Sequence, residues 1–379
     1  MSKKSDTQKN VVIVGGGFIG SAAARELSQK LDPARYKLIL INKRPYYVHL
    51  IAGARVTVAD EPGLDDRSLV PYDKLFVNGN GSFLRGNVTA IEETAPGKGG
   101  VVVLDDGERV PYAALLLASG SSWSGAINFP ESDDEVREHI AEWRKKYAAA
   151  HDIFLVGGGA VGIETAGEIK DAFPNKKVTI VQSGSMLLNS TYPDKFRKNI
   201  ERRVRQRGVN IIFNEFVDEF PAPGAVGVRT RSGKEFLTAD LVVPTFGARP
   251  NAGFVASLGS DVLTDAGFVK IKPTLEVVGH PGVFAAGDIM DWKEQKQAGK
   301  APAHIGVAVP NLLSFLAGQP QNKAYKGSIE MVVIPIGKYH GAGYFDVLWG
   351  ISVGNWVTSI LKGRELFVGK ARTDRGYPA

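Results

Sequence analysis

The chain of 379 residues contains no cysteine. This absence excludes disulfide bonds, thiolate metal ligands, a cysteine nucleophile and any redox-active pair of thiols. Long apolar runs are also missing, since the most apolar window, residues 341–361, holds four glycines, an Asp and an Asn. A membrane-spanning helix needs about 20 consecutive apolar residues. We therefore predict no such helix, and we expect this window to lie at an interface or to pack within the protein.

The amino-terminal segment, MSKKSDTQKN, has no apolar stretch and predicts neither a secretory signal nor a transit peptide. Ser2 stands where N-myristoylation requires glycine. Lys plus Arg (46) exceed Asp plus Glu (40), and this net charge of +6 mildly favours anionic partners such as dinucleotides, phospholipid headgroups or nucleic acid. We expect a cytoplasmic protein, not a secreted one, with a peripheral place on an organelle membrane as the alternative.

Two segments carry nearly the same pattern: VVIVGGGFIGSAAAREL at residues 11–27 and FLVGGGAVGIETAGEI at residues 154–169. Each combines an apolar strand, a G-x-G-x-x-G turn and a helix. A second strand follows each one, at residues 37–42 and 177–181. This context predicts two dinucleotide-binding units. The fold class is therefore α/β with two Rossmann-like domains, in a chain long enough for two or three domains.

Each glycine of such a turn has its own task. The first permits the tight turn, the second lets a pyrophosphate approach the backbone, and the third lets the helix pack closely. The helix N-terminus adds free N–H groups and a positive dipole end. We name residues 15–20 the first glycine turn and residues 157–162 the second glycine turn. The predicted phosphate-binding glycines are Gly15, Gly17 and Gly20 in the first, and Gly157, Gly159 and Gly162 in the second.

Two dinucleotides in one chain suggest a relay, because a flavin accepts a hydride from a nicotinamide and passes electrons onward. We therefore assign FAD to the first glycine turn, and NADH or NADPH to the second. Asp288, in FAAGD, supports FAD because a carboxylate at a strand end can hold ribityl hydroxyls. The alternative is that Asp288 only caps the following helix.

Amides occupy both positions where an acid usually binds the adenosine ribose: Asn42 in the first unit and Gln182 in the second. At Gln182 the missing carboxylate removes the repulsion that would exclude a 2′-phosphate, and Ser183 could donate to one. We therefore expect both NADPH and NADH to be accepted. The alternative is that Gln182 replaces Glu without consequence.

The motif order G-x-G-x-x-G, ASG, G-x-G-x-x-G-x-E, GARPN and AAGD resembles flavoproteins of the glutathione-reductase type. Within that group, YYVHLIAGAR at residues 46–55 and LKGRELF at residues 361–367 resemble the apoptosis-inducing-factor-like and ferroptosis-suppressor branch. That branch contains FAD-dependent NAD(P)H:quinone oxidoreductases and is related to type II NADH dehydrogenases. The chain departs from it in having Ala118-Ser119-Gly120 for an ATG-type segment and in lacking the myristoylated glycine.

The resemblance implies a domain plan. Residues 1–120 and 250–325 would form the FAD domain, residues 121–249 the inserted NAD(P)H domain, and residues 326–379 a C-terminal region that contacts quinone or membrane. The further cofactor-binding residues predicted with this plan are Lys43, Arg55, Val88, Ser119, Gly120, Gly247 and His304. We expect His304 to face the isoalloxazine, whereas His49 is either a site residue or a packed imidazole.

The acceptor follows from the lack of cysteine, which closes the route to thiol substrates, and from the resemblance, which implies a quinone. Three catalytic residues are then expected. Lys362 would be a cation near the flavin, Phe367 an aromatic at the quinone or membrane mouth, and Glu164, in the first turn of its helix, would reach the nicotinamide or its ribose. The alternatives are a solvated lysine for Lys362 and a helix-start acid for Glu164. We predict no metal site.

Two features bear on other partners. The tail holds Trp349 and Trp356 with basic residues, which suits a membrane interface, although both tryptophans could instead belong to a small core.

Seven basic residues between positions 195 and 207 raise the rival hypothesis of a nucleic-acid-binding effector. Phe196, Ile200 and Val204 recur at helical spacing, however, so we favour a helix with one buried stripe and a solvated basic face. A reductase of a small iron–sulfur carrier is a third alternative. The oligomeric state, monomer or homodimer, stays open.

Overall fold

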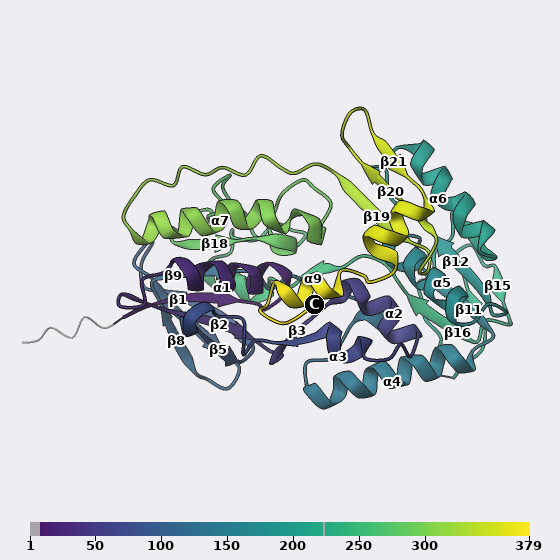
Figure 1. The fold of residues 1–379 in the computed structure, drawn as a ribbon, viewed down its shortest axis with the longest axis horizontal. Coiled ribbons are helices and arrows are strands. Elements are labelled where there is room, and N and C mark those ends of the chain that lie inside the picture. The colour runs from purple at the N-terminus through teal and green to yellow at the C-terminus, as the bar shows by residue number, and fades with distance from the viewer. Residues whose placement is uncertain (1–7, 223) are drawn as a thin grey trace, which may run out of the picture.

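The computed structural model describes residues 8–222 and 224–379, so Ser2 and the rest of residues 1–7, on which the expectations about the amino-terminal segment mainly rest, fall outside the described residues. Two parallel sheets lie toward opposite ends of an elongated molecule (Figure 1). The first sheet has the strand order β18-β9-β1-β2-β5. Its strands are β1 (Lys9–Val14), β2 (Tyr36–Asn42), β5 (Ser82–Arg85), β9 (Ala114–Leu117) and β18 (Val283–Ala285).

Both faces of this sheet are covered. Val11 and Ile13 pack against α1 (Phe18–Lys30) and α7 (Ala301–Leu316), while Val12 and Val14 belong to a second core beneath an antiparallel sheet. That sheet consists of β6 (Val88–Glu93), β7 (Gly100–Leu104) and β8 (Arg109–Tyr112). Alternate residues of a strand point to opposite faces, which explains why β1 is apolar at every position of its buried part.

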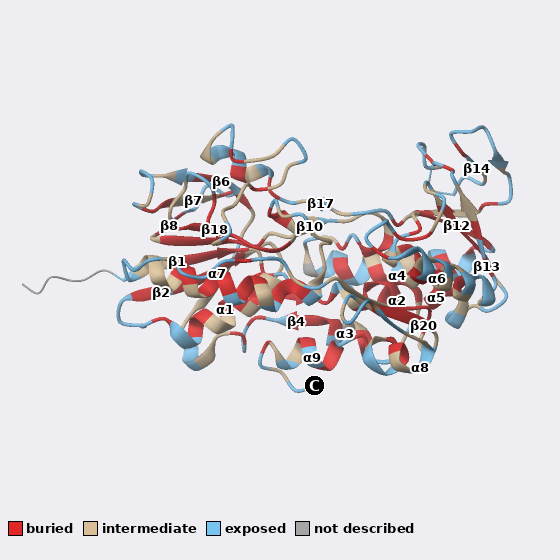
Figure 2. Ribbon diagram, turned by 90° about the horizontal axis from the view of Figure 1, so that it is seen from above, coloured by how far each residue is buried: buried red, intermediate tan, exposed pale blue. Residues whose placement is uncertain are grey.

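The second sheet has the order β13-β12-β11-β16. Its strands are β11 (Asp152–Val156), β12 (Lys177–Gln182), β13 (Val209–Phe213) and β16 (Leu241–Pro244), with a ribbon of β14 (Val228–Arg229) and β15 (Glu235–Phe236) beside it. The chain leaves the first sheet through β10 (Ser121–Ser122) and returns through β17 (Arg249–Pro250), which pair with each other between the two halves (Figure 2). The strands of the first sheet therefore come from chain segments before and after the second sheet. The domain limits stay a prediction.

The helices around the second sheet follow local signals. α4 (Asp133–Ala149) begins with an N-cap, in which the Ser132 side chain accepts a hydrogen bond from the Glu135 N–H at 3.3 Å. α6 (Asp194–Gln206) buries Phe196, Ile200 and Val204, which confirms the predicted stripe. Two short helices, α2 (Gly53–Val58) and α3 (Leu64–Ser68), were not predicted.

The C-terminal region crosses from α7 to the second half of the molecule along residues 317–330 (Figure 1). There, β19 (Met331–Pro335), β20 (Gly341–Phe345) and β21 (Ile351–Val353) form an antiparallel sheet against α5 (Ala160–Ala172). Gly167 of α5 allows this packing, because a Cβ there would lie 2.3 Å from the Gly337 nitrogen. The chain continues through α8 (Asn355–Thr358), a π-helical turn (Ser359–Gly363) and α9 (Val368–Thr373).

Residues 363–377, which we name the C-terminal strap, return to the first half of the molecule. Side chains of that half bind the strap by its backbone: Arg55 donates to the carbonyls of Gly363 and Arg364 at 2.5 and 2.9 Å, and His49 Nε2 donates to the Leu366 carbonyl at 2.6 Å. The side chain of Leu366 packs into a small apolar cluster with residues of α2, α3 and α4. The strap therefore fixes the position of Lys362, which directly precedes it.

Arg55 also joins the two halves of the molecule. Its Nε and Nη2 donate to the two carboxylate oxygens of Glu168 at 2.8 and 2.9 Å. Arg55 lies on α2 and Glu168 on α5, and both side chains are buried. A bidentate pair of this kind sets both distance and orientation between the two helices.

Replacing Arg55 by Met should lower the free energy of unfolding by about 3–5 kcal/mol, because it leaves the Glu168 carboxylate buried and unpaired. Replacing Glu168 by Leu should have a similar cost, and the double variant should lose less than the sum. The melting temperature of the four proteins measures this. The control is Arg109→Met, which breaks an exposed bidentate pair with Glu92 and should leave the melting temperature almost unchanged. Additive effects of Arg55→Met and Glu168→Leu would contradict the coupling.

His49 should make the docking of the strap sensitive to acid. Its Nε2 donates to Leu366, so its Nδ1 accepts from the Tyr47 hydroxyl at 3.0 Å, and the ring is neutral. Burial lowers the pKa of His49 from 6.5 to about 4. The contribution of the neutral His49 ring to the free energy of unfolding is therefore complete above pH 6.5 and is lost as the pH falls toward 4. About 2 kcal/mol of it is lost by pH 5. His49→Gln should make the melting temperature less dependent on pH between these two values. An unchanged pH profile would contradict the role assigned to His49.

Candidate functional site

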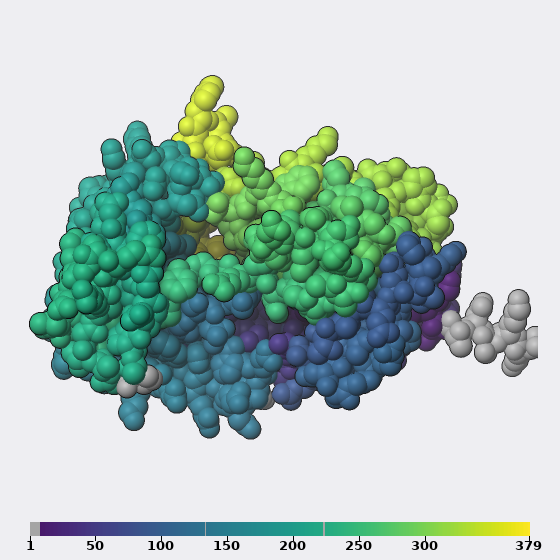
Figure 3. Space-filling model, turned by 180° about the vertical axis from the view of Figure 1, so that it is seen from behind, coloured from purple at the N-terminus to yellow at the C-terminus, as the bar shows by residue number. Residues whose placement is uncertain are grey.

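A cleft of about 730 Å³ lies between the two halves of the molecule. The first glycine turn and the start of α1 form one wall, and Ala160, Val161 and Glu164 of α5 reach it from the other half. Asp288 and Lys362 also line it. Figure 3 shows the molecule hollowed between the halves, with yellow C-terminal residues visible inside. Both predicted dinucleotide helices therefore open onto one space.

The first glycine turn has the geometry of a phosphate cradle. Gly15 has φ +101°, and a Cβ there would lie 2.4 Å from the Ala118 carbonyl oxygen. A Cβ on Gly20 would lie 1.7 Å from the Gly15 oxygen, so this position needs glycine for close helix packing. A Cβ on Gly17, in contrast, would meet nothing within 4 Å. The middle glycine therefore leaves the backbone accessible to a ligand, as a pyrophosphate requires.

The second glycine turn repeats this geometry. Gly157 has φ +124°, a Cβ on Gly162 would lie 2.0 Å from the Gly157 oxygen, and a Cβ on Gly159 would meet nothing within 4 Å. Neither α1 nor α5 has a side-chain cap at its N-terminus. The N–H groups of both helix starts can therefore bind phosphate oxygens. Both turns fit the dinucleotides predicted for them.

The amides Asn42 and Gln182 hold the glycine turns in equivalent ways. Asn42 Oδ1 accepts from the Gly16 N–H at 2.9 Å, and Gln182 Oε1 accepts from the Gly158 N–H at 2.8 Å. Their NH₂ groups donate to backbone carbonyls, of Arg44 at 2.9 Å and of Met186 at 3.2 Å. An ionised Asp or Glu could not make this second bond, because it only accepts. Contact of either amide with a ribose stays a prediction.

Several other predicted cofactor residues lie on the cleft wall. Asp288 accepts a hydrogen bond from Ser121 at 2.6 Å and caps neither its own short helix nor α7, so the capping alternative is wrong. Lys43 lines the cleft and pairs with Glu131 at 2.6 Å. The other predicted residues on the wall are Val88, Ser119 and Gly120.

Lys362 and Glu164 meet inside the cleft. The Lys362 ammonium lies 2.6 Å from Glu164 Oε1 and also donates to the Val333 carbonyl at 3.3 Å. Burial raises the pKa of Glu164, and the positive charge of Lys362 opposes this rise. One expectation needs correction: α5 begins at Ala160, so Glu164 is its fifth residue and lies beyond the first turn. The alternative that Lys362 is a solvated lysine is also wrong.

Nine predicted site residues are not among the described residues that line the cleft. Five of them belong to the glycine turns and their support described above: Gly20, Gly157, Gly159, Gly162 and Gln182. The other four have different positions. Arg55 is the buried partner of Glu168. His304 points to Glu294 instead of into the cleft, with Nε2 2.9 Å from Oε1, because α7 begins at Ala301 and turns this face toward the buried carboxylate. Phe367 lies at the surface with φ +57°, at the start of α9, and Gly247 follows β16 at an open position.

Two residues on the cleft wall were missed. The Tyr72 hydroxyl donates to the Gly16 carbonyl at 2.7 Å and so fixes the first glycine turn from outside. Lys296 donates to the carbonyls of Met290 and Trp292 at 2.8 and 3.2 Å, and burial lowers its pKa. No local pattern marks Tyr72. The position of Lys296, shortly after the AAGD motif, is the one signal that pointed toward it.

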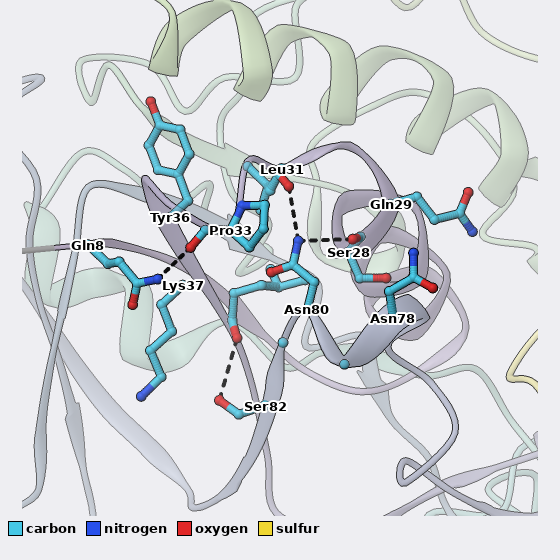
Figure 4. Close-up of a pocket in the computed structure, with 13 residues that line it drawn as sticks. Gln8, Ser28, Gln29, Leu31, Pro33, Tyr36, Lys37, Asn78, Asn80 and Ser82 are labelled. Carbon is cyan, nitrogen blue, oxygen red and sulfur yellow. Dashed lines mark hydrogen bonds between the residues drawn. The ribbon is translucent and has the colours of Figure 1, made fainter.

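A second cavity, of about 450 Å³, lies beyond the C-terminal end of α1 (Figure 4). Its polar groups bind one another: Asn80 donates to the carbonyls of Ser28 and Leu31, both at 3.0 Å, and Gln8 donates to the Pro33 carbonyl at 2.5 Å. Neither glycine turn and no carboxylate side chain is among the described residues that line this cavity. The chemistry of the molecule therefore concentrates in the cleft.

The tail tryptophans are exposed. Trp349 is fully accessible, and Trp356 is 73% exposed, so the alternative that both belong to a core is wrong. Among the described residues, every helix is too short or too polar to cross a bilayer.

Residues 9–310 match the pyridine nucleotide-disulphide oxidoreductase family. FAD-dependent oxidoreductase FVFD30 of Flammulina velutipes is 46% identical over 84% of this chain and 98% of the relative. Ferroptosis suppressor protein 1 of Taeniopygia guttata is 31% identical over 97% and 95%, and apoptosis-inducing factor homolog B of Dictyostelium discoideum is 28% identical over 95% of each.

Solved structures share the fold. The sulfide:quinone oxidoreductase of Aquifex aeolicus superposes with a TM-score of 0.75 at 16% identity, over 97% of this chain and 92% of the other. A covalent putidaredoxin reductase–putidaredoxin complex gives 0.69 at 21% identity, over 89% and 81%. The chain therefore belongs to the pyridine nucleotide-disulphide oxidoreductases, in the branch of the ferroptosis suppressor proteins and apoptosis-inducing-factor homologues, and is an FAD-dependent oxidoreductase that uses NAD(P)H.

Proposed function

We propose that this protein is an NAD(P)H:quinone oxidoreductase. The observation that carries the proposal is the Lys362 ammonium in the cleft onto which both dinucleotide helices open. The family name refers to disulphide substrates, but a chain without cysteine cannot supply the thiol pair that this chemistry needs. A diffusible acceptor is then required, and the likeness to ferroptosis suppressor proteins supports a quinone.

FAD, when bound, accepts a hydride from NAD(P)H and passes two electrons to the acceptor. The second glycine turn holds the pyrophosphate of the coenzyme, and Glu164, on the same helix, accepts hydrogen bonds from its nicotinamide end. Gln182 binds the turn and carries no charge, so it does not repel a 2′-phosphate. Both coenzymes should therefore support turnover.

Lys362 acts on the acceptor. Reduction of a quinone to a quinol adds two electrons and two protons, and negative charge develops on the quinone oxygens. One proton comes with the hydride and the other from solvent. An ammonium group at the cleft wall stabilises this charge and donates a hydrogen bond to the oxygen that carries it. Glu164, at 2.6 Å, holds the Lys362 ammonium in position at the cleft wall.

A lipid-soluble quinone has to be reached at a membrane surface. Leu348 and Trp349 are 78% and fully exposed at the turn between β20 and β21, and Trp356 and Ile360 are exposed on the helical segment that follows. Arg364 adds a cation nearby in the sequence. Exposed aromatic and aliphatic side chains with basic neighbours suit the interfacial region of a bilayer. We propose that this face of the C-terminal region contacts the membrane.

The function is tested on the purified holoenzyme without oxygen. NADH or NADPH should bleach the flavin absorbance, and quinones should restore it, whatever their tail length. Reoxidation that requires an added iron–sulfur protein would favour a carrier reductase. Salt-dependent DNA binding without bleaching by either coenzyme would favour the effector hypothesis.

Replacing Lys362 by Met should slow flavin reoxidation by quinone about 10²-fold, because it removes the group that stabilises charge on the quinone oxygens. Reduction by NADH should change far less. Stopped-flow absorbance separates these two half-reactions. Lys362→Arg should retain part of the rate. The control is Lys338→Met, which removes a C-terminal lysine that pairs with Glu61 at 2.9 Å. Equal slowing of both half-reactions by Lys362→Met would contradict the role.

Replacing Trp349 and Trp356 together by Ser should weaken binding to vesicles of phosphatidylcholine and phosphatidylserine by about tenfold, because the headgroup region then loses two aromatic side chains. Turnover with a short-chain, water-soluble quinone should stay unchanged. Vesicle co-sedimentation provides the measurement. Leu237, which is 75% exposed on the other half, is the matched control as Leu237→Ser. Unaltered vesicle binding of the double variant would rule out this face.

A further inference from the structure

The C-terminal strap carries a buried cation that forms no ion pair within the described part of the chain, although the neighbouring Asp374 carboxylate acts on its charge. The guanidinium of Arg375 is 1% exposed. Its Nη1 donates to the Ala371 carbonyl at 2.7 Å and its Nη2 to the Ser21 hydroxyl at 2.8 Å, while its Nε has no hydrogen-bond partner among the described residues. The guanidinium carbon lies 3.3 Å from the ring centre of Tyr47. Buried charges are normally paired with an opposite charge, so this one needs an explanation.

The position of Arg375 supplies the explanation. Ser21, which it contacts, lies in the first turn of α1 and donates its own hydroxyl to the Gly17 carbonyl at 2.7 Å. Gly17 is the glycine whose backbone is open toward the cleft. The Ser21 hydroxyl thus connects the guanidinium to the glycine turn that fits a pyrophosphate. Tyr47 and Phe18, against which it packs, line the cleft.

The other cations of this wall are already engaged. Lys43 pairs with Glu131 at 2.6 Å, and the Arg44 guanidinium donates to the carbonyls of Phe129 and Pro130. A pyrophosphate brings two negative charges, and an interaction between charges is strong where water is excluded. Burial lowers the pKa of Arg375, and a neighbouring anion would oppose that effect.

We propose that Arg375 is the counter-charge for the FAD pyrophosphate on the first glycine turn. It does not line the cleft, so it acts as a positioning residue, through Ser21 and through its field. Helix α1 provides only partial charges at its N-terminus, and the strap adds a full one. FAD binding and docking of the strap then stabilise each other, because the coupling between two binding events is reciprocal.

This coupling has a consequence for the cleft. Lys362 directly precedes the strap, so loss of the strap from the first half of the molecule would also displace the lysine. A chain without FAD would hold Lys362 less firmly. The inference rests on the FAD site alone and is independent of which acceptor the enzyme uses.

The first experiment measures FAD release from the holoenzyme, followed as the rise in flavin fluorescence after dilution. Arg375→Met should release FAD at least tenfold faster than the wild type, and Arg375→Lys, which keeps the charge, should stay within threefold. Lys370→Met is the matched control, since Lys370 lies on α9, directly before the turn that holds Arg375, and pairs with Asp374 at the surface. Release of FAD from Arg375→Met at the wild-type rate would overturn the proposal.

The second experiment needs no variant and so remains informative if Arg375→Met fails to fold. The full chain is stripped of FAD, its second glycine turn is saturated with NAD⁺, and trypsin cleavage at Lys370 and Arg372 is followed by mass spectrometry. FAD and ADP, which both carry the diphosphate, should protect the strap, whereas riboflavin should not. Equal cleavage with ADP and with riboflavin would mean that Arg375 is only structural. Neither experiment contains an electron acceptor, so both outcomes are separate from the test of quinone reduction.

Discussion

The arrangement of the cleft depends on the buried guanidinium of Arg55. It is bound by four oxygen atoms, two from Glu168 and one each from the carbonyls of Gly363 and Arg364. The planar group donates in fixed directions, so it sets α2, α5 and the start of the strap relative to one another. Glu164 lies one turn before Glu168 on α5 and accepts a single hydrogen bond from Lys362. One helix of the second half thus holds two cations, one from the first half and one from the C-terminal region.

Local signals in the sequence were sufficient for most of the framework. The glycine spacing predicted both turns, although the atoms that restrict Gly15 and Gly157 belong to Ala118 and to Thr245 and Phe246, which follow strands far along the chain. Helix α6 buries Phe196, Ile200 and Val204 as predicted, since the spacing that marks this stripe lies within the segment itself. The amides at Asn42 and Gln182 were recognised as departures from an acidic pattern. Their donation to backbone carbonyls became visible only in three dimensions.

Long-range pairings were beyond sequence reasoning. Arg55 and Glu168 are 113 residues apart, and Arg375 and Ser21 are 354 apart, so no period or motif connects them. The resemblance of residues 46–55 to a family motif marked Arg55 as important but suggested the wrong task. A buried arginine can contact a ligand or join helices, and only its partners distinguish the two. His304 failed for a related reason, because the start of α7 decides which face of the helix meets the cleft.

The two glycine turns are nearly identical, yet one has to retain its dinucleotide and the other has to exchange it at every turnover. The difference lies in what surrounds each turn. The Gly16 carbonyl is bound by the Tyr72 hydroxyl, and the strap lies behind the adjoining helix, with Arg375 against Ser21. At the second turn the Gly158 carbonyl is bound by the backbone of Leu188, and Phe246 beside it is 45% exposed. On the proposal made for Arg375, retention at the first turn therefore comes from elements added outside the repeated unit.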